Sequence, residues 1–172
     1  MITDPIRVCE LLVGLPDVNV LGVEDNGGDV PLRLHIESRR ARPSCQGCGS
    51  PAEVKDRPMV ELVDLPVFGR PVRTVWRKHR WRCPNVECRA GSWTGIDGRI
   101  AAPRLGMTDR AGRWVTRQVG ECGRTVAEVA RELDCDWHTV NDTVLAYGEA
   151  LLEADTSRVG QVSALGMDET LF

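Results

Sequence analysis

Hydrophobic and polar positions alternate with a strand-like period through much of the first hundred residues. In residues 32–37 every second residue is Leu or Ile, the pattern of a strand with one buried face. Residues 18–23 form a similar apolar run, and the Asn-Gly-Gly sequence within residues 24–29 is a strong turn signal. We therefore predict a hairpin of two strands, preceded by a short amphipathic helix at residues 5–13.

Two more strands are predicted before the pattern changes at Pro103. Residues 60–65 form one of them, and residues 72–81 form a single long strand. Pro66 and Gly69 mark the turn between these two strands. The part of the chain before Pro103 is therefore expected to be rich in β-structure.

After Pro103 the apolar residues recur at helical spacing and the strand signals vanish. Thr108 is placed to cap a helix that runs to about residue 119. Thr125 is placed to cap a second helix, with Glu128 three residues on completing a capping box. A third helix is predicted at residues 136–153.

Charge is strongly segregated along the 172 residues, although the net charge is only −3. Residues 70–117 contain twelve Lys and Arg against three Asp and Glu, whereas residues 1–30 and 118–172 are acidic. Such a basic block indicates a nucleic-acid-binding surface, and an unevenly charged solvated surface is the alternative. No apolar run approaches the roughly 18 residues of a membrane span, and the N-terminal segment lacks a signal-peptide cleavage site. We expect a cytoplasmic protein.

Two cysteine pairs have the spacing of a metal site. Cys45 and Cys48 are separated by two residues, and Cys83 and Cys88 by four. A hairpin between the pairs can bring them together, and four thiolates suit a tetrahedral, structural Zn²⁺ with no open coordination position. The alternatives are four reduced core cysteines, an iron–sulfur cluster or a redox pair.

The other three cysteines fall at apolar positions of predicted helices. These are Cys9, Cys122 and Cys135. We expect them to be small core residues, because reduced cysteine behaves as a small hydrophobic side chain.

The strand that leads into Cys83 mixes basic residues with tryptophans. Arginine and lysine can neutralise phosphates, while tryptophan can stack or pack. We expect some of its basic residues to contact a DNA backbone, or alternatively to lie on the outer face of a strand that packs inward. The candidates are Arg73, Arg77, Lys78, Arg80 and Arg82.

Residues 125–144 have the spacing of a helix-turn-helix. Ala130 lies where the two helices would cross, and Asp134 occupies a turn position often held by glycine. The start of the second helix would then face base edges in a major groove. Its candidate contacts are Trp137, His138, Asn141 and Asp142, and the basic residues of the preceding helix are Arg110, Arg113 and Arg117. A helical hairpin used only for packing is the alternative.

The order of these features resembles that of the transposases of the insertion-sequence family ISL3. The resemblance rests on the cysteine pairs, the segment "DLPVFGRPVR" between them, the three-helix unit and the terminal "LGMDET". It implies that the cysteine knuckle and the helix-turn-helix recognise the terminal inverted repeats of a transposon, and that a ribonuclease-H-like domain follows.

The resemblance also implies that Asp168 is the first of three acidic residues that hold two Mg²⁺ ions for strand transfer. The other two are absent from these 172 residues. We therefore expect no strand cleavage by this polypeptide alone, and Mg²⁺ only in a full-length relative.

The expected chain is α+β: a β-rich four-cysteine zinc module at residues 1–103 and a helix-turn-helix unit at 104–155. Residues 156–172 would form a linker and the first strand of the next domain. The expected partner is double-stranded DNA. We expect no association with a membrane, and a homodimer is possible. A zinc-containing transcription regulator and a zinc-stabilised protein-interaction module are the alternative functions.

Overall fold

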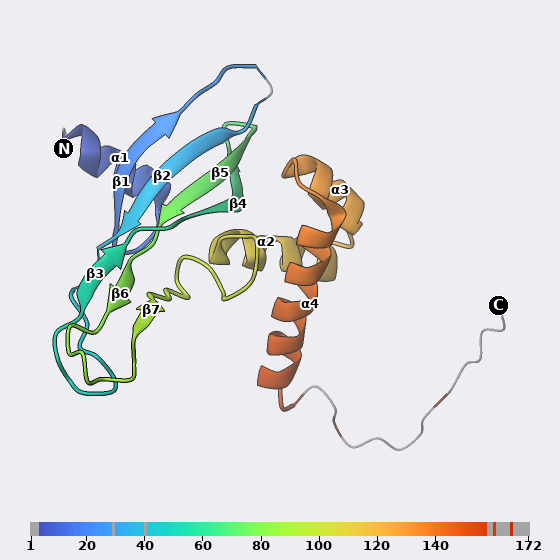
Figure 1. Ribbon diagram of the computed structural model, residues 1–172. Coiled ribbons are helices and arrows are strands. Elements are labelled where there is room, and N and C mark those ends of the chain that lie inside the picture. The colour runs from blue at the N-terminus through green and yellow to red at the C-terminus, as the bar shows by residue number, and fades with distance from the viewer. Residues whose placement is uncertain (1–3, 29, 40, 158–159, 161–165, 167–172) are drawn as a thin grey trace.

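The computed structural model describes residues 4–28, 30–39, 41–157, 160 and 166, and it confirms an α+β fold (Figure 1). A four-stranded sheet and a smaller three-stranded sheet precede three helices in the chain. The remaining helix, α1 (Pro5–Val13), lies against the larger sheet, and its bounds agree with the predicted helix. Among the described residues, no helix combines the length and apolar character needed to cross a membrane.

The larger sheet consists of two hairpins joined side by side. β1 (Val18–Glu24) and β2 (Leu32–Ser38) form the predicted antiparallel hairpin, and β4 (Met59–Val67) and β5 (Arg70–Arg77) form a second one. A parallel pairing of β2 with β5 gives the order β1-β2-β5-β4. The core on its inner face comprises Leu15, Val18, Leu34, Ile36, Leu62, Val72, Trp76, Ile100 and Ala101.

The smaller sheet has the strand order β3-β6-β7. It contains β3 (Glu53–Asp56), β6 (Arg80–Arg82) and β7 (Ser92–Thr94). The two outer strands are too short to show a periodic pattern, and the sequence predicts only the middle one, as part of a longer strand. This sheet positions the segments that carry the four paired cysteines.

The prediction of one continuous strand over residues 72–81 is wrong, because the chain changes sheets after Arg77. Trp76 and Trp81 are an odd number of positions apart, so an unbroken strand would point them to opposite faces. The break lets both rings be buried, Trp76 in the core of the larger sheet and Trp81 in the smaller sheet. Burial of two large aromatic side chains outweighs the lost strand pairing.

Three capped helices complete the fold, and each begins where the sequence predicts. They are α2 (Asp109–Gly120), α3 (Val126–Glu132) and α4 (Trp137–Ala154). Thr108 caps α2, and Thr125 forms the predicted capping box with Glu128 at the start of α3. Asp136 caps α4.

Asp64 on β4 joins the sheet to the helices. Its carboxylate is fully buried and accepts hydrogen bonds from the hydroxyls of Thr74 and Thr108. Arg110 of α2 donates to both carboxylate oxygens at 2.7 Å. Burial raises the pKa of Asp64, but the hydrogen bonds and charge of Arg110 outweigh it, so this pKa is lowered. These contacts cross the boundary predicted near residue 103 and fix the helices on the sheet.

The three cysteines outside the pairs do not share one environment. Cys135 packs against the helical core, as expected. Cys9 and Cys122 are exposed, so the prediction that they are core residues is wrong. Cys122 lies in the loop just beyond the C-cap residue of α2, while Cys9 lies on α1, where Leu11 and Leu12 are exposed as well.

Candidate nucleic-acid interface and metal centre

Helices α3 and α4 form the predicted helix-turn-helix on a small apolar core. Val129, Ala130 and Leu133 from the α3 side are buried against Val140 of α4. The small side chain of Ala130 lets the two helices approach closely. Helix α2 and Val63 of β4 share this core, so the helix-turn-helix is held as one body with the sheet.

The turn between α3 and α4 is clamped from the larger sheet. Asp134 has a φ of 51°, in the left-handed region that favours glycine. Arg73 of β5 donates hydrogen bonds to the backbone oxygens of Leu133 and Asp134, and its side chain is largely buried. Arg73 and Arg110, both predicted DNA contacts, are thus engaged in holding the helices to the sheet.

The first turn of α4 is fixed by its cap. The carboxylate of Asp136 accepts from the backbone N–H of Thr139 at 2.8 Å and from its hydroxyl at 2.6 Å. These two bonds, the hydroxyl first, lower the pKa of Asp136. The cap leaves the residues that follow it free to face outward.

The predicted base-facing residues lie together on the first half of α4. They are Trp137, His138, Asn141 and Asp142. Trp137 is 47% exposed, His138 and Asp142 are exposed, and Asn141 is half-buried. No lysine or arginine occurs in α4. Any phosphate that accompanies this helix in a groove must therefore be neutralised from another element.

Most basic side chains of β5 and β6 are paired with acidic residues of neighbouring strands. The pairs are Arg77–Glu37, Arg80–Asp56 and Arg82–Glu53. The sequence shows a basic block, but folding places carboxylates beside it and removes much of its field. Exposed pairs of this kind contribute little to stability, typically about 0–1 kcal/mol.

Arg113 and Arg117 of α2 remain the most accessible of the predicted basic contacts. Each pairs with an acid one helical turn away, Asp109 and Glu121 respectively. Their side chains are 72% and 69% exposed, so both guanidinium groups can also reach an external phosphate.

The four paired cysteines meet in one cluster, with their sulfur atoms all within 4.8 Å of one another. The Sγ atoms of Cys45 and Cys88 are 3.7 Å apart, and those of Cys48 and Cys83 are 3.4 Å apart. A tetrahedral site with Zn–S bonds of about 2.3 Å has edges of about 3.8 Å, whereas a disulfide needs about 2.05 Å. The spacing therefore fits one metal ion shared by both pairs.

The backbone around the cluster is shaped for sulfur ligands. A Cβ atom on Gly47 would lie 3.1 Å from the Sγ of Cys88, so a larger residue here would push the sulfur by a few tenths of an ångström. Backbone amides also donate hydrogen bonds to three of the sulfurs. The amide of Ser50 donates to Cys48, that of Asn85 to Cys83 and that of Ala90 to Cys88.

The thiols of the cluster differ in acidity. The hydroxyl and amide of Ser50 lower the pKa of Cys48 to about 6, while burial raises the pKa of Cys83 to about 12. Four close sulfurs cannot all be thiolates without a cation, because their charges repel. A bound divalent cation would supply that charge, so the donor set suits a closed structural site.

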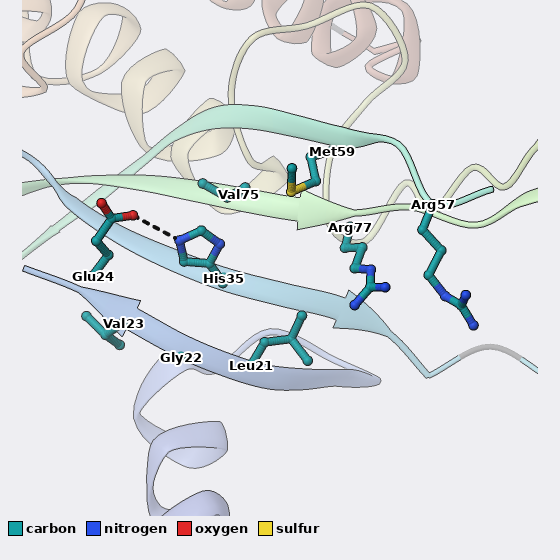
Figure 2. A pocket seen from close by; sticks show the side chains of 9 residues that line it. All are labelled: Leu21, Gly22, Val23, Glu24, His35, Arg57, Met59, Val75 and Arg77. Carbon is teal, nitrogen blue, oxygen red and sulfur yellow. Dashed lines mark hydrogen bonds and ion pairs between the residues drawn. The ribbon is translucent and has the colours of Figure 1, made fainter.

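A shallow hollow of about 520 Å³ lies on the outer face of the larger sheet (Figure 2). His35 borders it with its imidazole 3.3 Å from the carboxylate of Glu24. Arg57 and Arg77, at its other end, both contact Glu37. Because these polar groups satisfy one another, we assign no ligand to this hollow.

The fold and the exposed face of α4 define a helix-turn-helix DNA-binding protein. Residues 99–148 match the family model described as the helix-turn-helix domain of transposase family ISL3. This segment is therefore similar to the helix-turn-helix domain of ISL3 transposases, which supports DNA binding by the chain. The match spans α2, α3 and most of α4 but not the cysteine cluster.

No curated protein and no solved structure matches the chain. Asp168, the residue expected to begin the acidic triad of a following domain, lies outside the described residues.

Proposed function

We propose that this chain recognises the terminal inverted repeats of its transposable element by placing the first half of α4 in the major groove. The observation that carries the proposal is the exposed start of α4 within a region that matches the ISL3 helix-turn-helix domain. Recognition of element ends is the DNA-binding task of a transposase, because it selects where strand transfer takes place.

Within α4 the proposed readout uses neutral and acidic side chains. The amide of Asn141 can pair with adenine through two hydrogen bonds, and the carboxylate of Asp142 can accept from the amino group of cytosine. Trp137 and His138 contact one another edge to face with ring centroids 5.4 Å apart, so an aromatic edge stands at the start of the helix. Arg113 and Arg117 of α2 would contact the flanking phosphates.

We further propose that the metal held by Cys45, Cys48, Cys83 and Cys88 is Zn²⁺ with a structural role. Its support is the tetrahedral spacing of the sulfurs and the amide hydrogen bonds to them. Zn²⁺ would fix the smaller sheet and would take no part in chemistry at DNA.

The test is a fluorescence-anisotropy titration with a duplex that covers the terminal repeat flanking the gene, beside a scrambled duplex of equal length. We expect tighter binding to the terminal repeat, with a ratio that survives rising salt. Asn141→Ala should remove roughly 1–3 kcal/mol of that discrimination, the usual value of a two-bond contact to a base. Glu153→Gln, at the far end of α4, is the matched control and should keep the ratio.

Equal binding to both duplexes at every salt concentration would contradict recognition of element ends. It would leave a helix-turn-helix that touches only phosphates. Stronger binding to a promoter of the host than to the terminal repeat would favour a transcription regulator instead.

A further inference from the structure

The phosphate contacts that α4 lacks can be sought among the basic residues that the fold leaves without an acidic partner. Lys78 and Arg104 are two of the described basic residues that make no ion pair with another described residue. Both line one groove of about 370 Å³. One wall of the groove is formed by β4, and the other by residues 101–106, which lead into α2.

Lys78 lies at the break between β5 and β6, with its ammonium group 4.3 Å from the centre of the Trp76 ring. The indole face holds the cation in place without neutralising it. Partial burial lowers the pKa of Lys78, and no nearby carboxylate offsets the effect. Glu61 also lines the groove, but it pairs with Arg33 at 2.9 Å. Within the described part of the chain, Lys78 is therefore a positioned cation without an acidic partner.

Arg104 is held in a backbone conformation that L-residues rarely adopt. The N–H of Leu105 bonds to the oxygen of Ala102, and Pro103 and Arg104 are the two central residues of that turn. The φ of 68° at Arg104 makes this a type II turn, whose third position favours glycine. Arg104 is exposed and makes no hydrogen bond or ion pair with another described residue, so its side chain does not offset the strain of this turn. Strain of this kind at an exposed residue points to a function outside the fold.

The loop that forms one wall of the groove reaches the start of α4, the helix proposed to read the bases. A Cβ atom on Gly106 would lie 3.5 Å from the methyl group of Thr139, so the end of the loop touches the first turn of α4. The backbone oxygen of Gly106 accepts from the N–H of Val63, which anchors the loop on β4. In Figure 1 this segment runs between β7 and α2. A DNA strand that passes the first turn of α4 would next meet this loop.

We propose that Lys78 and Arg104 form a binding site for the phosphodiester backbone of the DNA that α4 reads. This inference rests on the proposed function for the orientation of the DNA, and it names the cations that α4 itself lacks. The site is independent of sequence: it fixes the register of the duplex, while α4 supplies the specificity.

The experiment is a salt titration of binding to a random 20-base-pair duplex, compared among Lys78→Gln, Arg104→Gln, the double variant and the wild-type chain. Each lost phosphate contact should reduce the slope of log K against log salt by about 0.9, and the double variant by about 1.8. The wild-type advantage over each single variant should therefore shrink about 3.5-fold between 50 and 200 mM salt. Arg7→Gln is the matched control, because this exposed arginine of α1 is paired with Glu10 and is not among the predicted DNA contacts, so its slope should equal that of the wild type.

Arg104→Gly separates a DNA contact from a structural role. Glycine suits the left-handed turn, so the melting temperature should stay the same or rise while the slope still falls by about 0.9. A double variant with the wild-type slope, or an Arg104→Gly variant with full salt dependence, would overturn the proposal. Because these slopes are measured on random DNA, they remain informative even if the chain shows no preference for element ends.

Discussion

The helix-turn-helix and the smaller sheet are stabilised in different ways. The three helices share an apolar core that includes Met107, Val115, Leu133 and Val140, and all four side chains are almost fully buried. The strands β3, β6 and β7 contribute one fully enclosed ring, Trp81, and their connecting segments meet at four sulfurs. The difference shows that burial can hold the helices, whereas the smaller sheet has little core and would depend on the metal that we propose for its four cysteines.

Removal of a sulfur ligand should have the largest effect. That effect should be confined to the smaller sheet and should leave the helices unchanged. Cys45→Ser should abolish stoichiometric zinc binding and expose the amides of the smaller sheet to exchange, because zinc binding in such sites supplies on the order of 10 kcal/mol of folding energy. Hydrogen exchange read by mass spectrometry and metal analysis check this. Cys122→Ser, an exposed cysteine outside the cluster, is the control and should change neither. Unchanged protection of β3, β6 and β7 in Cys45→Ser would refute the distinction.

Asp64→Asn should weaken the connection between sheet and helices. The change leaves Arg110 partly buried beside a neutral group, so we expect a loss of about 3–5 kcal/mol in the free energy of unfolding. Urea denaturation followed by circular dichroism measures it. Glu61→Gln on the same strand breaks only an exposed pair and should cost about 1 kcal/mol or less. Equal losses in the two variants would contradict the role of Asp64.

The same pair predicts a pH dependence. The folded-state pKa of Asp64 is lowered from its ordinary value of 3.8, so its stabilising contribution is complete above that value and is lost as the pH falls below it. The difference in unfolding free energy between wild type and Asp64→Asn should therefore be constant from pH 7 to pH 5 and shrink below about pH 4. A difference that stays constant down to pH 3 would contradict this assignment.

Gly112→Ala tests how tightly the helical core is packed. An added Cβ atom would lie 2.7 Å from the ring of Tyr147, whose hydroxyl donates to Asp109. The ring must shift and weaken that bond, so we expect a loss of about 1–3 kcal/mol in unfolding free energy. Gly120→Ala in the same helix meets no atom within 4 Å and should be neutral or slightly stabilising. Thermal melts of both variants decide the matter, and a neutral Gly112→Ala would show that the crossing is looser than described.

Asp134→Gly should have the smallest effect and the opposite sign. Glycine adopts the left-handed conformation of this turn without strain, and the backbone oxygen that accepts from Arg73 remains. We expect a gain of up to about 1 kcal/mol in unfolding free energy, seen as a higher melting temperature. A lower melting temperature would mean that the Asp134 side chain itself holds Arg73, from which it lies 3.8 Å away.

The helices could be predicted because their signals are local in the sequence. The pairing of distant strands could not be predicted, because it leaves no local signal. Thr108, Thr125 and Asp136 begin the three helices because a cap is recognised within four residues of sequence. The parallel pairing of β2 with β5 joins segments distant in the chain and leaves no local pattern. The cysteine spacing predicted the cluster, because ligand geometry restricts the number of intervening residues.

The basic strand shows the same limit at the candidate site. A count of charges along residues 70–117 cannot reveal that Glu37, Glu53 and Asp56 fold back beside the arginines. Nor does the sequence show that Arg73 is directed at a backbone turn. Arg104 could have been noticed from Pro103 before it, since a residue after proline in a turn is often glycine.

The most direct test of the central claim, that α4 reads bases in the major groove, is binding to terminal-repeat duplexes in which single adenines are replaced by 7-deaza-adenine. This change removes only the N7 acceptor from the major groove. We expect one or two replacements to weaken binding by the wild-type chain by about tenfold, and the same replacements to have no effect on binding by Asn141→Ala. Equal losses in both proteins, or no loss at any adenine, would contradict the assignment of Asn141 and α4 to the major groove.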